Sequence, residues 1–152
     1  MNHEYMHTAV GAIGVVVNAD NEVLLVLSKD RGWEPPMGFL EAGESPLLAL
    51  EREVREESGY AIHVLRLSGV YHTVRNGMPL LSFCFLCEAG ELVGTPDDET
   101  LGVQWVAREK LQEVMTYPPH IVRVTDALKG GGMSFRDYQL EPFQVLRTCL
   151  LL

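Results

Sequence analysis

Cysteine and long apolar runs are both scarce in this 152-residue chain. Its three cysteines are too few for a disulfide-stabilised secreted domain, and their odd number fits a reducing compartment. Cys84 and Cys87 are spaced C-x-x-C, but no second pair completes a zinc site, and the surrounding LLSFCFLC is more typical of a buried strand than of a metal or redox site. No run is long enough to span a bilayer, and the N-terminal residues lack the features of a signal peptide. We therefore expect a cytoplasmic protein.

Positive charge is also in short supply. The chain has 12 lysine and arginine residues against 21 aspartate and glutamate residues, which gives a formal net charge of −9. Such a chain gains nothing from bulk electrostatics when it meets nucleic acid or an anionic membrane, so we expect neither as a partner. If the substrate is itself anionic, a bound metal ion or a few placed arginine and lysine residues must offset the repulsion.

The histidines lack the spacing of metal ligands. They are scattered at His3, His7, His63, His72 and His120. Single histidines of this kind are usually structural or exposed. The glycine run 130–132 is not a phosphate-binding loop either, because it follows an expected helix and no Lys-Ser or Lys-Thr pair comes after it. Neither a histidine metal centre nor a P-loop is therefore expected.

What the chain does contain fits an ordinary globular domain. Hydrophobic residues make up 47% of it and charged residues 22%, and the chain is long enough to bury a core. Apolar and β-branched runs between turn residues predict strands, and helical spacing after capping residues predicts helices. The expected strands are 8–17, 23–27, 62–74, 80–87 and 102–106, with hairpin turns at 18–21 and 76–77. The expected helices are 46–58, 108–115 and 120–128, and 30–37 is an expected loop.

These elements predict one domain over residues 1–152. Strands and helices mix without strict β-α-β alternation, which indicates an α/β sandwich with a mixed, partly antiparallel sheet. Residues 130–152 follow as a C-terminal extension whose place in the fold the pattern does not define. Its apolar end would pack against the core or against a second subunit, as a homodimer, through Leu146, Leu150, Leu151 and Leu152.

The most informative segment is 38–60. Glu53, Glu56 and Glu57 are spaced i, i+3, i+4, so on a helix they converge on one face. Like charges this close destabilise an isolated helix. Hard divalent ions such as Mg²⁺ or Mn²⁺ are natural partners of clustered carboxylates. An acidic helical stripe is otherwise most often a solvated face, so the surrounding residues must decide between the two.

The surrounding residues resemble the Nudix box, whose pattern is G-x5-E-x7-R-E-U-x-E-E-x-G-U with U a bulky aliphatic residue. The positions in register are Gly38, Glu44, Arg52, Glu53, Val54, Glu56, Glu57 and Gly59. Only Tyr60 departs, at a packing position. Trp33 and Pro36 resemble the W-x-x-P-G-G lead-in of the family, although Met37 replaces its first glycine. The resemblance implies a Nudix-type α/β/α sandwich that covers all but about the last twenty residues.

The resemblance also implies roles for these residues. The implied metal ligands are Gly38, through its backbone carbonyl, and Glu53, Glu56 and Glu57. Arg52 lies one turn from Glu56, so we expect it to orient carboxylates by paired hydrogen bonds, with Glu44 as support or as a ligand through water. The general base is expected to be Glu53 or a loop acid, since family members often carry a ligand or base in the loop before the last sheet strand. Asp97, Asp98 and Glu99 all qualify by position, and Glu99 is favoured.

Substrate contacts are harder to assign from the sequence. Arg31 and Arg75 fall in expected loops from which they would reach a phosphate, although solvent exposure is the commoner situation for such residues. Trp33 or Tyr71 would stack on a nucleoside base, unless each is simply a core residue.

The expected function is that of a divalent-metal-dependent hydrolase that cleaves the diphosphate linkage of a small nucleoside diphosphate derivative. No signature of a family subclass is evident downstream of the box, so a MutT-like (d)NTP pyrophosphohydrolase is the default. ADP-ribose and nucleotide sugars are the alternative substrates. A non-catalytic Nudix-fold binding module is disfavoured, because such proteins usually lose a box carboxylate and this chain keeps them all.

Overall fold

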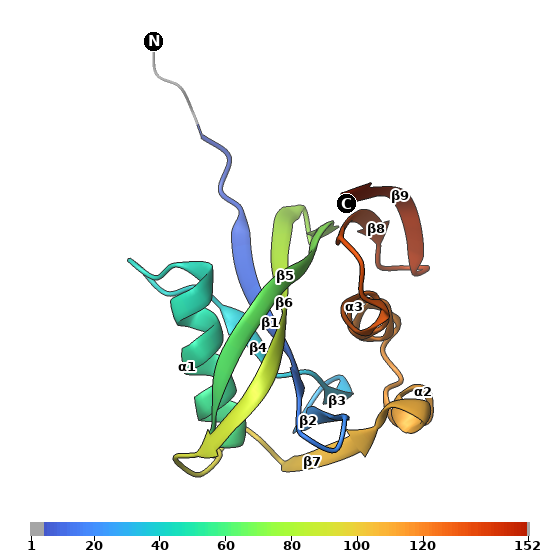
Figure 1. Cartoon of the computed structure of the whole chain (residues 1–152). Coiled ribbons are helices and arrows are strands. Elements are labelled where there is room, and N and C mark those ends of the chain that lie inside the picture. The colour runs from blue at the N-terminus through green and yellow to red at the C-terminus, as the bar shows by residue number, and fades with distance from the viewer. Residues whose placement is uncertain (1–4, 152) are drawn as a thin grey trace.

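A computed structural model describes residues 5–151 (Figure 1). Its strands are β1 (Ala9–Val17), β2 (Glu22–Ser28), β3 (Gly32–Glu34), β4 (Met37–Phe39), β5 (Tyr60–Arg75), β6 (Met78–Leu92), β7 (Gly102–Ala107), β8 (Met133–Gln139) and β9 (Gln144–Leu151). Its helices are α1 (Pro46–Ser58), α2 (Leu111–Val114) and α3 (Pro118–Lys129), with a 3₁₀ turn η1 (Arg108–Lys110) before α2. The sheet runs in the order β3-β2-β1-β6-β5-β8-β9, while β4 pairs with β1 and β7 pairs with β2.

The sheet is mixed, because β1 pairs with β6 and β5 pairs with β8 in parallel while the other pairs are antiparallel. Side chains of β1 alternate between two apolar clusters. Ala12 packs in a cluster with Leu50 of α1, and the next residue, Ile13, packs in a second cluster with Val124 of α3. Figure 1 shows α1 on one side of the strands and α3 on the other. The α/β/α sandwich expected from the sequence is therefore confirmed.

The helix α1 begins and ends where the sequence predicts. Ser45 caps it, with Oγ accepting from the Leu48 N–H at 3.3 Å, and a proline occupies the first turn. Gly59 ends it with φ at +82°, a conformation that favours glycine. A Cβ added to Gly14 of β1 would lie 3.1 Å from Leu50 Cδ1, so the helix packs closely on this strand. The position of α1 over β1 is thereby fixed.

The expected loop at 30–37 is wrong in part, because it contains β3 and the first residue of β4. β4 pairs antiparallel with β1, with Gly38 opposite Ala12. A strand of three residues is too short to show an alternating pattern, and its pairing depends on the longer neighbouring strand. This pairing brings Gly38 next to α1.

Two expected helices also differ from the structure. The segment 108–115 forms only η1 and the short α2, and the helix expected at 120–128 begins at Pro118, a residue suited to a first helical turn. His120 therefore lies in the first turn of α3. The two hairpins and the strand at 102–106 are confirmed as β1–β2, β5–β6 and β7. Arg75 is the last residue of β5 and not part of a loop.

The C-terminal extension forms a hairpin of β8 and β9 that continues the sheet beyond β5. The leucines of β9 do not reach the core: Leu146, Leu150 and Leu151 are 54%, 65% and 48% exposed, whereas Leu140, between the two strands, packs against it. Packing of the β9 leucines against the core, one of the two expected arrangements, is therefore wrong. Leu152 and His3 lie outside the described residues.

The cysteines follow the interpretation made from the sequence. Cys84 and Cys87 are fully buried free thiols on β6, whereas Cys149 is exposed on β9. The C-x-x-C spacing therefore belongs to a core strand. No helix within residues 5–151 is long and apolar enough to cross a membrane.

Candidate active site

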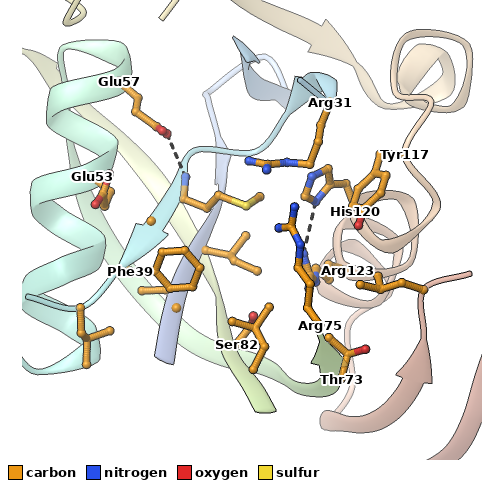
Figure 2. A pocket seen from close by; sticks show the side chains of 18 of the residues that line it. Arg31, Phe39, Glu53, Glu57, Thr73, Arg75, Ser82, Tyr117, His120 and Arg123 are labelled. Carbon is orange, nitrogen blue, oxygen red and sulfur yellow. Dashed lines mark hydrogen bonds between the residues drawn. The ribbon is translucent and has the colours of Figure 1, made fainter. Parts of the chain in front are cut away.

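A cavity of about 490 Å³ is lined by residues of α1, α3 and the strands β1, β4, β5 and β6. This volume is in the range of small-molecule sites. Figure 2 shows Glu53 and Glu57 of α1 on one side, and Arg31, His120 and Arg123 on the other. The cavity therefore has an acidic wall and a basic wall.

Gly38 is required by the close approach of β4 to the acidic wall. A Cβ at this position would lie 2.1 Å from Glu53 Cδ, far closer than two such atoms can approach. Any side chain at position 38 would displace the Glu53 carboxylate from the cavity. This contact is a physical reason for the first glycine of the box.

Glu57 links α1 to β4 by accepting a hydrogen bond of 2.9 Å from the Met37 N–H. Burial raises the pKa of Glu57 to about 8; the Met37 N–H opposes this rise and the charge of Glu53 adds to it. Burial also raises the pKa of Glu53, against the effect of Arg52. Two carboxyl groups with raised pKa values on one wall favour a bound cation, which would stabilise their ionised forms.

Arg52 is the centre of the hydrogen bonds that hold this wall. Nε and Nη2 donate to the two oxygens of Glu44 at 2.7 and 2.9 Å, and Nη1 donates to Glu53 at 2.7 Å and to Glu56 at 3.1 Å. Nη2 also donates to the Phe39 carbonyl at 3.1 Å, which ties α1 to β4. The guanidinium of Arg52, with the Glu41 N–H, lowers the pKa of Glu44 to about 2. These contacts are what an orienting role for Arg52 and a supporting role for Glu44 require; the roles in catalysis stay predictions.

The carboxylates of α1 fit a divalent ion in part. Glu53 and Glu57 both line the cavity, and oxygen donors of this kind suit Mg²⁺ or Mn²⁺. Glu56 is not among the lining residues; its side chain is 46% exposed and bonded to Arg52. Within residues 5–151, no three His, Cys, Asp or Glu side chains are grouped as a ready metal site. The fit therefore rests on Glu53 and Glu57, and ligation by these two residues, by Gly38 and by Glu56 stays a prediction.

The acidic loop 97–99 reaches the cavity through Glu99, which is one of its lining residues. Asp97 makes contacts within the fold instead. Its N–H donates to the Glu56 carbonyl at 2.7 Å, and its carboxylate accepts from the N–H groups of Glu99 and Thr100 at 3.2 and 3.0 Å. Asp97 therefore fixes the loop against α1. Of the acids in this loop, the structure brings the predicted Glu99 to the cavity.

The expected substrate contacts divide between the cavity and the core. Arg31 and Arg75 both line the cavity. Trp33 is partly buried against the apolar core, and Tyr71 is 1% exposed; neither is among the lining residues. The structure therefore does not bring Trp33 or Tyr71 to a place where a nucleoside base would stack in this cavity.

Sequence reasoning missed His120, Arg123 and Tyr138, which belong to the basic wall. His120 is 1% exposed, with Nε2 2.8 Å from Glu34 Oε2 and Nδ1 3.3 Å from Arg123 Nη1. Because an arginine only donates, Nδ1 accepts, and the proton of the neutral ring lies on Nε2, toward Glu34. Arg123 also donates to the Tyr138 hydroxyl. The usable signal was the pair of prolines before His120, which places His120 and Arg123 on one helical face.

These contacts decide the charges of the basic wall. Burial lowers the pKa of His120 to about 4, against the effect of Glu34. Burial alone would raise the pKa of Glu34, but its contacts with His120 and Arg31 lower it. Arg31 donates to both oxygens of Glu34, at 2.7 and 3.0 Å. At neutral pH the basic wall therefore holds a neutral His120 and an Arg31 whose charge is already paired with Glu34 through two hydrogen bonds.

Comparison with known proteins shows the family to which this chain is related. The NUDIX domain family model matches residues 7–127. A MutT-like protein of Streptomyces ambofaciens is 34% identical over 131 residues, which are 86% of this chain and 83% of that protein. A putative 8-oxo-dGTP diphosphatase of Bacillus subtilis is 31% identical over 82% of each chain. A NUDIX hydrolase structure from Nitrosomonas europaea has a TM-score of 0.72 at 27% identity, covering 82% of this chain and 90% of that one.

The matched region runs from before β1 to the last turn of α3. It includes α1, the acidic loop and the basic wall except Tyr138. The hairpin β8–β9 lies beyond it, as the sequence resemblance implied. A match of this extent, together with the curated relatives, identifies the chain as a member of the Nudix family of hydrolases.

Proposed function

We propose that the protein is a Mg²⁺- or Mn²⁺-dependent pyrophosphohydrolase that cleaves the diphosphate linkage of a nucleoside diphosphate derivative. The observation that carries this proposal is the pairing of two unlike walls in one cavity. The acidic wall suits a divalent ion, and the basic wall suits phosphate oxygens. Either a metal ion or placed basic residues would offset the repulsion between an acidic chain and an anionic substrate, and this cavity offers sites for both. The residues concerned are Glu53 and Glu57 on one wall and Arg31, Arg75 and Arg123 on the other.

In this proposal the residues around α1 hold the metal and one another. Glu53 and Glu57 would bind the ion, with the Gly38 carbonyl and Glu56 as further ligands. When bound, the ion supplies neutralisation of charge on the phosphate oxygens and a more acidic water. Arg52 fixes the direction of the Glu53 carboxylate, because its bond to Glu53 leaves that side chain little freedom.

Hydrolysis also needs a base. We assign Glu99 to this role in preference to Glu53, because Glu53 is bonded to Arg52 whereas the Glu99 carboxylate has no hydrogen-bond partner within residues 5–151. The water oxygen forms a new bond to phosphorus, and the bond from phosphorus to the leaving phosphate oxygen breaks. The proton of the water passes to Glu99.

The default substrate in this proposal is a (d)NTP. Support comes from the MutT-like protein and the putative 8-oxo-dGTP diphosphatase, whose matches cover 86% and 82% of the chain. ADP-ribose and nucleotide sugars are the alternatives, since the cavity of about 490 Å³ does not by volume select among them. The retained box carboxylates weigh against a ligand-binding regulator without turnover.

A panel assay tests this proposal. Formation of the nucleoside monophosphate is measured by chromatography over dNTPs, oxidised dNTPs, ADP-ribose and nucleotide sugars, with Mg²⁺, with Mn²⁺ and with EDTA, because this product is common to diphosphate cleavage in every class. We expect cleavage in at least one class, only with a divalent ion, and its loss in Glu57→Gln. Glu51→Gln, on the exposed face of the same helix, is the control and keeps activity. No cleavage across the panel refutes the enzyme and favours a binding module, and cleavage unchanged in Glu57→Gln refutes the site assigned to it.

We also propose a homodimer as the arrangement that covers β9. In the described part of the chain, β9 lies at one edge of the sheet and carries three exposed leucines. A free edge of this kind is open to pairing with a second copy. Light scattering over a range of protein concentrations measures the mass, and a monomer throughout would refute this arrangement.

A further inference from the structure

Arg123 is a buried cation without a carboxylate partner. Its residue is 5% exposed, and within residues 5–151 no Asp or Glu oxygen lies within 4.0 Å of its guanidinium. It donates toward His120 and Tyr138, and it lies 5.6 Å from the ring centres of Tyr71 and Tyr138. These neighbours are neutral. Because an arginine keeps its charge, this wall carries a buried positive charge without an ion-pair partner among residues 5–151.

Unsatisfied polar atoms gather at the same wall. His120 Nε2 has the Glu34 carboxylate 2.8 Å away. Besides this His120 atom, two buried side-chain polar atoms of the described chain lack a hydrogen-bond partner, namely Thr73 Oγ1 and Arg123 Nε. Both residues line the cavity, and Thr73 is 2% exposed. Such groups are rare in folded proteins, so two of them on residues that line one cavity point to a partner that the described chain does not supply.

Arg75 adds a second positive charge at this place. It is two residues beyond Thr73 on β5, so both side chains lie on the same face of the strand. It forms no ion pair with any residue in 5–151, whereas Arg31 is already paired with Glu34. Figure 2 shows Thr73, Arg75 and Arg123 together, on the side of the cavity away from α1.

An anion fits these three residues better than a nucleobase does. A base carbonyl would accept hydrogen bonds, but it would leave the charge of Arg123 unbalanced in a buried place. A phosphate or carboxylate group accepts from guanidinium and hydroxyl donors and also supplies the missing negative charge. The walls themselves offer no such group within reach of Arg123, so it must come with the ligand.

We propose that Thr73, Arg75 and Arg123 form a second anion subsite, which binds a phosphate or carboxylate group of the substrate. This inference rests on the proposed function and narrows its substrate class. The substrate carries an anionic group beyond the diphosphate that lies against α1. The γ-phosphate of a nucleoside triphosphate, a phosphate on a ribose and the carboxylate of a sugar acid share this chemistry.

Three matched pairs of compounds separate these sources. The pairs are dGTP and dGDP, 2′-phospho-ADP-ribose and ADP-ribose, and UDP-glucuronate and UDP-glucose. Binding is measured by calorimetry with Mg²⁺ on the Glu57→Gln protein, so that affinity is read with turnover suppressed. In at least one pair we expect the more anionic member to bind about 10- to 100-fold more tightly, the range of a hydrogen bond to a charged group. The pair that responds identifies the source of the anion.

Variants then assign the preference to the subsite. Thr73→Val keeps the side-chain shape and removes the unpaired hydroxyl, so the ligand-free melting temperature stays the same or rises while the preference shrinks. Arg75→Gln removes an exposed charge that no fold contact needs. Arg123→Lys keeps the positive charge but loses the planar guanidinium group, so part of the preference for the anionic ligand survives. Thr125→Val and Arg108→Gln, exposed and away from the cavity, keep the full preference.

The outcomes separate this subsite from the proposed function. A preference lost in Thr73→Val and Arg75→Gln supports the subsite. Equal affinity within all three pairs, or a preference that these variants leave intact, overturns it. Turnover by the wild-type enzyme without any preference refutes the subsite and leaves the hydrolase standing. Binding of the anionic members through Thr73 and Arg75, without turnover of any compound by the wild type, refutes the hydrolase and leaves the subsite standing.

Discussion

Replacement of His120 by glutamine tests whether the buried ring is neutral, with Nε2 2.8 Å from Glu34 and Nδ1 facing Arg123. Glutamine keeps a donor for Glu34 and an acceptor for Arg123, but it does not titrate. Burial lowers the pKa of His120 to about 4 in the folded protein, from the ordinary value of 6.5 that applies in the unfolded chain. The two states therefore differ in bound protons only between these values.

The sign of the effect follows from this difference. Between pH 6.5 and pH 4 the unfolded chain binds a proton that the folded protein does not, so the free energy of unfolding falls as the pH falls. At about 1.4 kcal/mol for each pH unit the full effect is about 3 kcal/mol, of which about 2 kcal/mol is lost by pH 5. Above pH 6.5 the ring is neutral in both states. The lowered pKa of Glu34 adds a loss in the same direction, but only as the pH falls below its ordinary value of 4.5.

Urea unfolding at pH 7, 6 and 5, followed by tryptophan fluorescence, measures this effect. Between pH 7 and pH 5 the wild-type protein should lose about 2 kcal/mol more than His120→Gln does. His63→Gln, which changes an exposed histidine of β5, serves as the control and should keep the wild-type slope. If wild type and His120→Gln lose stability in parallel, the ring is not held neutral between Glu34 and Arg123, and the charges assigned to the basic wall are wrong.

Three further variants test the acidic wall. Mg²⁺ should raise the melting temperature of the wild type more at pH 8 than at pH 6, because the raised pKa of Glu57 leaves less carboxylate at the lower pH. Glu57→Gln should remove most of this gain in melting temperature. Equal gains at the two pH values would count against ligation by Glu57. Gly38→Ala should fold but lose about 10²-fold in kcat/KM, since the new Cβ displaces Glu53, whereas Gly94→Ala, with open space around it, should not; retained activity in Gly38→Ala would contradict this account. Arg52→Lys keeps the charge without the fork and should lose at least about tenfold in kcat, and full activity would show that the paired bonds are not needed.

The acidic wall was predictable because its residues are close in sequence. Helical spacing alone puts Glu53 and Glu57 one turn apart, and Ser45 and Gly59 set the ends of α1 by local backbone chemistry. The contact between Gly38 and Glu53 adds one longer connection, which the register of the box already contains. Local periodicity therefore sufficed for this part of the site.

Short elements and chain ends escaped prediction for physical reasons. β3 and β4 have three residues each, so no alternation distinguishes them from a loop. β9 exposes most of its side chains, so its sequence lacks the alternation of apolar and polar residues that marks a half-buried strand. Trp33 shows another limit of sequence reasoning. The sequence identifies an aromatic residue near the box, but it does not tell whether this residue lines the cavity or, as in the structure, packs against the core.

Apart from Arg31 and Arg75, the basic wall could not be read from the sequence, because its members come from distant segments that only tertiary structure brings together. Thr73 lies on β5, Arg123 on α3 and Tyr138 on β8. Tyr138 belongs to the hairpin that lies outside the region matched by the family model, yet its hydroxyl accepts from Arg123. The part of the chain beyond the family match thus supplies a hydrogen-bond partner to Arg123, a residue of the proposed anion subsite. If Arg123 selects the substrate, the chemistry is set by the shared box and the choice of substrate is set in part by this extension.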